Sequence, residues 1–249
     1  MRISHKYKFV YIAIPKTGSS TVRYLLDKYS DISSDDPYWS LTIGPHPNAK
    51  QIKTYFDIKG WNWDEYFKFT VVRHPIPRIK SSIAYALKAG EQAYKSSNYS
   101  LKVLTAYADA ISSANIDNGL KGDQLKWELS TRMLYEEKIS VIDFMYKHMA
   151  NQYSYVYNDS KKCLVNEIIK LEYFESGLQK VWKRLGLDNR DLLHIPKYNV
   201  TEPLFQTMCS NKLMDIDVFG KYRKFIKEKF QQDFYHFKYE YLKDFLSPC

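Results

Sequence analysis

Residues 14–21, which read IPKTGSST, combine a lysine, a glycine and several small hydroxylated side chains. Backbone N–H groups at the start of a helix have no partner within the helix, and the helix dipole is positive there. A loop of this composition that opens a helix therefore suits phosphate or a similar tetrahedral anion. Because Lys16 adds a point charge, the segment predicts an anion-binding site.

The flanking residues predict the strand and the helix that hold this loop. Phe9–Ile14 are apolar, and most of them are β-branched or aromatic, as expected of a buried strand. Apolar side chains then recur at the i, i+3, i+4 and i+7 spacing of an amphipathic helix, at Val22, Leu25, Leu26 and Tyr29. The predicted order is strand, tight loop and helix.

The loop differs from the phosphate-binding loop of nucleoside triphosphatases. In that motif, G-x-x-x-x-G-K-[ST], the lysine follows the last glycine. Here Lys16 precedes Gly18, and no glycine stands four or five residues upstream. A simple turn capped by Ser19 or Ser20, with Lys16 in solvent, is the alternative that this motif leaves open.

A second group of basic and hydroxylated residues follows a second predicted strand, residues 67–72. Pro75 opens a helix, and Ser81 lies about two turns along it. Arg73 ends the strand, and the forked guanidinium of an arginine can donate two hydrogen bonds to one phosphate. Arg73 and Ser81 can therefore reach one anion; a solvated arginine and a surface serine are the alternative.

The composition favours anionic partners. The 249 residues carry 37 Lys and Arg against 28 Asp and Glu, a net charge of +9, which suits phosphates, sulfates, acidic sugars, nucleic acid or a membrane surface. Nucleic acid is disfavoured because the basic residues are spread along the chain without a basic tail or finger spacing. Many of the 22 tyrosines should be half-buried or line grooves, because the ring and the hydroxyl group favour different surroundings.

Cysteines and histidines show no metal-ligand spacing and no disulfide framework. No signal peptide and no apolar run long enough to span a membrane are found. We therefore expect a cytoplasmic protein without a metal or a membrane span. The residues concerned are Cys163, Cys209 and Cys249, and His5, His46, His74, His148, His194 and His236.

Strands alternate with helices along the chain, which predicts an α/β domain with a mostly parallel sheet. A third strand is expected at Leu164–Leu171, followed by a helix at Phe174–Leu185 that Gly186 ends. Ligands of such sheets bind at the carboxyl ends of the strands, so the two anion-binding segments should share one edge. Further helices are expected near residues 49–56, 75–87, 101–114, 123–135, 140–150 and 217–234, and loops at 31–48 and 194–203.

No linker rich in Pro, Gly or Ser divides the chain. We expect one domain over residues 1–249, with the polar residues 88–122 forming a mobile lid or a substrate-side insertion.

Together the two segments resemble the sulfotransferases that use 3′-phosphoadenosine 5′-phosphosulfate (PAPS), especially the carbohydrate and heparan or chondroitin type and its bacterial relatives. IPKTGSST resembles the loop of that family that binds the 5′-phosphosulfate. Residues 72–81, VRHPIPRIKS, match the fixed positions of V-R-[DNH]-P-x-x-R-x-x-S, which binds the 3′-phosphate. Residues 167–187 and 194–203 resemble later segments, so the likeness runs from about residue 7 to about residue 240. It implies a P-loop-like, three-layer fold.

The resemblance implies a role for each matched residue. Lys16 would neutralise charge on the bridging oxygen as it leaves, and Arg73 and Ser81 would hold the 3′-phosphate. PAPS would be the co-substrate, 3′-phosphoadenosine 5′-phosphate (PAP) the product, and no metal would take part. The 5′-phosphate would be cradled by Thr17, Gly18, Ser19, Ser20 and Thr21, and the nucleotide covered by Lys197, Asn199 and Thr201.

The acceptor hydroxyl needs a general base, and a histidine suits neutral pH. His46 lies in the loop Gly44-Pro45-His46-Pro47, in the region where glycan members of the family carry their histidine. His74 is the rival, and a loop histidine bonded to backbone is the alternative.

The function expected is transfer of the sulfuryl group from PAPS to an acceptor hydroxyl, preferably of a carbohydrate, with a flat small molecule as the other acceptor. A P-loop-like nucleotide kinase or NTPase is disfavoured because G-K-[ST] is missing. The remaining alternative is a non-catalytic binder of acidic glycans or nucleic acid through the basic surface.

Overall fold

The computed structural model describes residues 1–33, 44, 46–96, 100–101, 105, 119–196, 207 and 223–240. The chain divides into two compact units. The first comprises Met1–Arg78, Asn151–Val200 and Lys229–Cys249, and the second Ile79–Ala150 and Thr201–Glu228. The expectation of a single domain stays a prediction.

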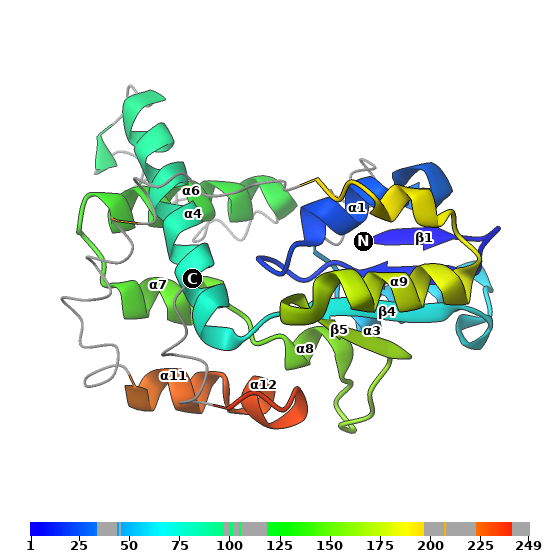
Figure 1. The fold of residues 1–249 in the computed structure, drawn as a ribbon. Helices are drawn as coiled ribbons and strands as arrows, with labels where there is room; N and C mark the ends of the chain where they lie inside the picture. The colour runs from blue at the N-terminus through cyan, green and yellow to red at the C-terminus, as the bar shows by residue number, and fades with distance from the viewer. Residues whose placement is uncertain are drawn as a thin grey trace. The chain divides into compact units, whose positions relative to one another are not determined.

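A five-stranded sheet forms the centre of the first unit (Figure 1). The strands predicted from the sequence, β2, β4 and β5, pair in parallel, whereas β1 runs antiparallel to both β2 and β3. The expected mostly parallel sheet is therefore confirmed for these three strands and wrong at the other edge, where β1 and β3 make the sheet mixed. The order is β3 (Ile32–Ser33), β1 (Arg2–Ser4), β2 (Phe9–Ile12), β4 (Phe67–Val72) and β5 (Glu167–Lys170).

One face of the sheet packs against α1 (Ser19–Leu26) and α9 (Phe174–Leu185). Tyr11 and Phe69 point to this face because alternate strand residues share a side, and they pack in one cluster with Trp182 of α9. The helix α9 has the predicted bounds and ends at Gly186, which adopts the left-handed conformation.

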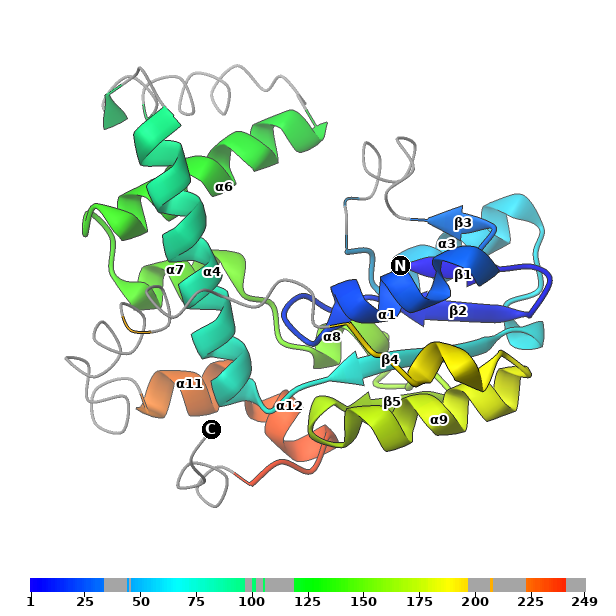
Figure 2. The ribbon, with the colours of Figure 1, turned by 45° about the horizontal axis from the view of Figure 1, so that its top comes forward.

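The opposite face packs against α3 (Ala49–Lys59). Val10 and Ile12, the alternate residues of β2, are fully buried against Phe56 of this helix. The side chain of Asn48 accepts a hydrogen bond from the backbone of Gln51 and closes a capping box, which fixes where α3 begins. Helices on both faces give the first unit three layers (Figure 2).

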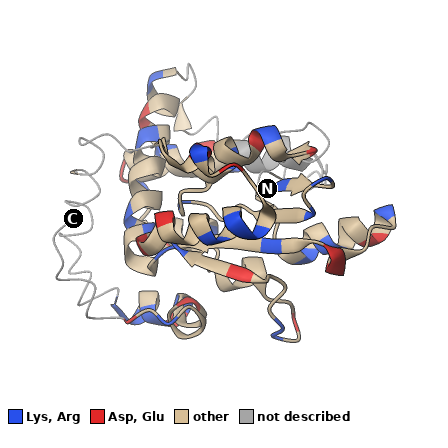
Figure 3. Cartoon of the chain, turned by 45° about the vertical axis from the view of Figure 1, so that its right-hand side comes forward, with Lys and Arg blue, Asp and Glu red and all other residues tan. Residues whose placement is uncertain are grey.

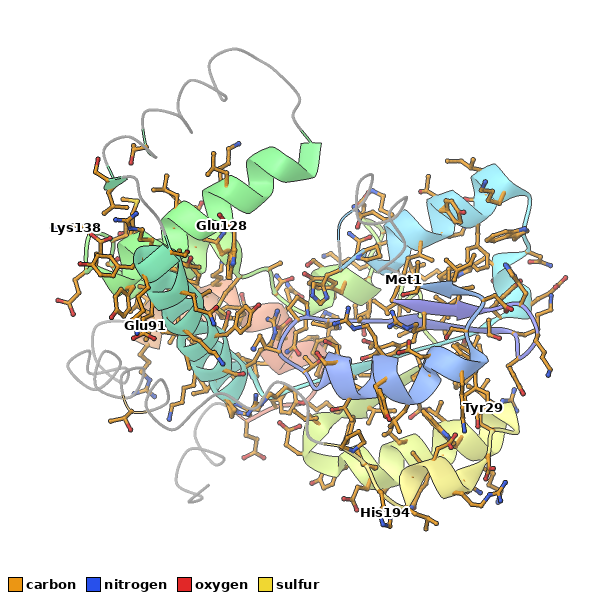
Figure 4. The ribbon with its side chains drawn as sticks, turned by 90° about the horizontal axis from the view of Figure 1, so that it is seen from above. Met1, Tyr29, Glu91, Glu128, Lys138 and His194 are labelled. Atoms are coloured by element: carbon orange, nitrogen blue, oxygen red, sulfur yellow. The ribbon has the colours of Figure 1, made fainter. Side chains whose placement is uncertain are left out.

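The second unit is helical in the residues that the structure describes. Glu91 lies on α4 and Glu128 on α6 (Figure 4). These helices approach closely, because a Cβ at Gly90 would lie 2.2 Å from the carbonyl oxygen of Thr131. Ser140 caps α7 by accepting the backbone N–H of Asp143 at 3.1 Å. The helices are α4 (Pro75–Ser96), which begins in the first unit, α6 (Gly119–Tyr135), α7 (Val141–His148) and α11 (Arg223–Lys229), which ends in the first unit.

The remaining short elements belong to the first unit. They are α8 (Tyr153–Val156), α12 (Gln231–His236), and the 3-10 turns η1 (Asp27–Tyr29), η2 (Trp63–Glu65), η3 (Leu171–Tyr173) and η4 (Asn189–Leu192). The single helix expected at 217–234 is wrong where described, because Phe230 separates α11 from α12. Residues 88–96 continue α4, and most of the expected lid lies outside the described residues, as does most of the expected helix at 101–114. None of the helices in the described ranges combines the length and apolar character that a bilayer crossing needs.

Candidate active site

The two anion-binding segments follow neighbouring parallel strands. In the register of β2 and β4, Ile12 lies beside Thr70. The loop that starts at Pro15 and the turn that starts at Arg73 therefore leave the sheet at the same edge, as the sequence predicted. This edge carries the carboxyl ends of the strands, where ligands of such sheets bind.

The loop between β2 and α1 holds an uncommon backbone conformation. Lys16 has a φ of 66° and Gly18 a φ of 77°, and positive φ in a non-glycine residue is concentrated at functional sites. Gly18 is the N-cap of α1 and no side chain caps the helix, so the alternative of a turn capped by Ser19 or Ser20 is wrong. Gly18 itself has no side chain that could accept the first N–H groups of α1.

The threonine hydroxyl groups of this segment donate hydrogen bonds to main-chain carbonyl groups. Thr17 donates to the carbonyl of Ile14 at 2.9 Å, and Thr21 donates to the carbonyl of Pro196 at 3.0 Å. Thr17 and Ser19 are buried and Ser20 is half-buried. These hydroxyl bonds anchor the loop, so any phosphate contact from Thr17 or Thr21 would come from the main chain.

Arg78, a fixed position of the second motif, braces the first loop. Its Nε–H donates to the carbonyl oxygen of Pro15 at 3.1 Å, and only 3% of the residue is exposed. The carbonyl is thereby held directly before Lys16. This contact was missed in the sequence, where Arg78 appeared only as a motif residue.

Lys16 and Arg73 are like charges at the shared edge. The pKa of Lys16 is lowered to about 8, mainly by burial and further by the positive charge of Arg73. Both effects disfavour the ammonium form, and an anion between the two cations would reverse the second. Strongly shifted groups of this kind concentrate at functional sites.

His46 lies against the strand end that precedes the loop. Its Nδ1 is 2.7 Å from the carbonyl oxygen of Ala13. A carbonyl can only accept, so Nδ1 carries the proton and Nε2 is the basic nitrogen. Burial of the ring lowers the pKa of His46 to about 4, with Arg23 and Arg78 adding to the fall. The imidazole is therefore neutral at neutral pH.

His74 has both ring nitrogens bonded to backbone. Nδ1 accepts the N–H of Ile76 at 3.2 Å, and Nε2 donates to the carbonyl of Glu240 at 3.2 Å. The backbone N–H of His74 donates to Glu172 at 2.8 Å, and the residue is 3% exposed. These bonds fix the turn after β4 and favour His46 over His74 as the base.

The other predicted site residues cannot be assembled in the same way. Ser81 is half-buried on α4, in the part of the helix that belongs to the second unit. Lys197, Asn199 and Thr201 lie outside the described residues. Within the described ranges, no three His, Cys, Asp or Glu side chains gather as a metal site would require.

The sequence matches a family of known proteins over most of its length. A family model described as "Sulfotransferase family" matches residues 1–240. The chain belongs to the sulfotransferase family. No curated protein and no solved structure matches it significantly. The sulfotransferase thus carries its family's group-transfer activity, and the edge holding Lys16, His46 and Arg73 is the candidate site for it.

Proposed function

We propose that this sulfotransferase moves the sulfuryl group of PAPS to a hydroxyl of a carbohydrate, by in-line displacement and without a metal. The observation that carries the proposal is the pair of like charges at one edge of the sheet. Lys16 and Arg73 follow adjacent parallel strands, and the charge of Arg73 lowers the pKa of Lys16. Two phosphate-bearing ends of one nucleotide would offset this repulsion.

The two anion-binding segments would each hold one end of the nucleotide. PAPS, when bound, supplies an activated sulfuryl group. The start of α1 and Lys16 would bind its 5′-phosphosulfate, and Arg73 its 3′-phosphate. Lys16, an ammonium at neutral pH, stabilises the charge that develops on the bridging oxygen.

His46 completes the proposed chemistry. Its Nδ1–H bond to Ala13 leaves Nε2 as the proton acceptor, and a neutral imidazole can take the proton of an attacking hydroxyl. The proposed base is thus held by the main-chain carbonyl of Ala13, which directly follows β2 and precedes the proposed phosphosulfate loop.

A carbohydrate acceptor is supported by the charge of the chain and its aromatic content. The net charge is +9, and lysines and arginines occur on many of the described helices and strands (Figure 3). Such a surface attracts acidic saccharides, and aromatic rings pack against the apolar faces of sugars. We propose the cytoplasm as the place of this activity.

The first test is nucleotide binding without metal. We expect PAP to bind in the presence of a chelator, and to bind more tightly than adenosine 5′-phosphate (AMP), because only PAP engages both anion sites. Isothermal titration calorimetry measures both affinities. A requirement for magnesium, or equal affinity for AMP, would contradict the two-phosphate assignment, and metal-dependent turnover of ATP would favour a kinase or NTPase.

Arg73→Ala should weaken PAP binding by about 2–3 kcal/mol, the scale of lost charge-assisted hydrogen bonds. AMP binding should change little, because AMP lacks the phosphate that Arg73 is proposed to hold. Arg190→Ala is the control, since that guanidinium pairs with Asp188 on the surface. An equal loss for PAP and AMP would contradict the role of Arg73.

A further inference from the structure

One buried glutamine holds both polar groups of the Arg73 backbone. The N–H of Arg73 donates to Oε1 of Gln152 at 2.8 Å, and Nε2 of Gln152 donates to the carbonyl of Arg73 at 2.8 Å. Gln152 is fully buried. Because a primary amide offers a donor and an acceptor side by side, it pairs with this residue as a neighbouring strand would.

Gln152 is itself held by a buried carboxylate. Asp233, on α12, accepts the backbone N–H of Gln152 at 2.9 Å, its Nε2 at 3.3 Å and the N–H of Tyr153 at 2.8 Å. Asp233 is fully buried and faces the positive charge of Arg78. The amide of Gln152 thus has a fixed orientation.

Gln152 holds Arg73 at a point where the chain no longer pairs with a neighbouring strand. β4 ends at Val72, whose partner on β5 is Lys170, and Pro75 has no N–H to donate. Arg73 therefore lies between the last ladder residue and the helix start. The direction of its side chain follows from its backbone, and a displacement of about 1 Å at a positioning group can cost a hundredfold in rate.

We propose that Gln152, oriented by Asp233, is a positioning residue that aims Arg73 at the 3′-phosphate and so sets the preference for 3′-phosphorylated nucleotides. This inference rests on the proposed function. A purely structural residue at this place would affect all nucleotides alike. Gln152 instead acts through Arg73, which is proposed to bind only the 3′-phosphate.

The test compares the PAP and AMP dissociation constants of Gln152→Met, which keeps the side-chain length but removes both hydrogen bonds to Arg73, together with the side-chain bond to Asp233. We expect the AMP-to-PAP ratio to fall by about tenfold, with AMP affinity nearly unchanged. In the Arg73→Ala background the same substitution should cause no further fall, because interacting residues are non-additive. Asn166→Ala is the matched control: its amide accepts the N–H of Lys68, at the other end of β4, at 2.9 Å.

Each outcome has one meaning. If wild-type protein does not prefer PAP, the proposed function fails. If Arg73→Ala removes the preference but Gln152→Met keeps it, or lowers both affinities equally, the positioning role of Gln152 is overturned.

Gln152→Asn is the second variant if methionine prevents folding, because its shorter side chain cannot span both groups of Arg73. If neither variant folds, amide hydrogen exchange on the wild-type protein decides. Under the proposal, PAP slows exchange at Arg73 more than AMP does, and equal protection by the two nucleotides overturns it.

Discussion

Replacing His46 with alanine should lower the rate of sulfuryl transfer by about a hundredfold or more, the usual contribution of a positioned base. Nucleotide affinity should be unchanged, because the proposed role of the imidazole is toward the acceptor hydroxyl. The measurement is the initial rate with radiolabelled PAPS, using an acceptor found by screening saccharides and small phenols.

The pH dependence of this rate separates a catalytic role from a structural one. The pKa of His46 is lowered from 6.5 to about 4, so the base stays neutral across the physiological range. The rate should therefore fall only as the pH approaches 4, whereas a histidine of ordinary pKa would place this limb near pH 6.5. The variant should lack this acid limb.

The lowered pKa of His46 also makes the stability of the fold depend on pH. An unfolded histidine binds its proton near pH 6.5, and folded His46 does so only near pH 4. Between these values the unfolded state holds more protons, so His46 makes stability rise with pH across this window and fall on acidification. In His46→Ala this part of the acid sensitivity should be absent.

The control for His46→Ala is His194→Ala, at an exposed histidine (Figure 4). That variant should keep the wild-type rate. Near wild-type transfer by His46→Ala would make the Ala13 hydrogen bond purely structural and would return the base assignment to His74 or a carboxylate.

Lys16→Ala should lower turnover by roughly a hundredfold to a thousandfold, the range observed when a transition-state charge stabiliser is removed. PAP affinity should fall less, because the charge on the bridging oxygen develops only as the bond breaks. Single-turnover rates and calorimetry on the same preparation separate the two effects.

The lowered pKa of Lys16 also predicts a loss of activity at high pH. Its pKa is lowered to about 8, so kcat/KM should fall as the pH rises through about 8 and the ammonium charge is lost. The Lys16→Ala variant should lack that limb. If Lys16→Ala and Arg73→Ala changed only affinity, and by equal amounts, Lys16 would be a binding residue without a special part in the transfer.

The sequence by itself determined the local elements of the first unit. Apolar runs rich in β-branched and aromatic residues located β2 and β4, and Gly186 marked the end of α9, because these signals act between residues close in the chain. The anion-binding loops could also be predicted, since their position after parallel strands follows from the order of the elements. The hairpin partner β1 carried too few residues for a periodic signal.

Only the tertiary structure decided which hydrogen bonds hold these loops and which protonation state His46 adopts. Arg78 reaches Pro15 across 63 residues of sequence, and Gln152 reaches Arg73 across 79. Such hydrogen bonds depend on which buried groups the fold brings within about 3 Å, and no local pattern encodes that. The pKa of His46 likewise follows from burial and from arginines distant in sequence, so the residue could be selected from its loop, but its neutral state could not.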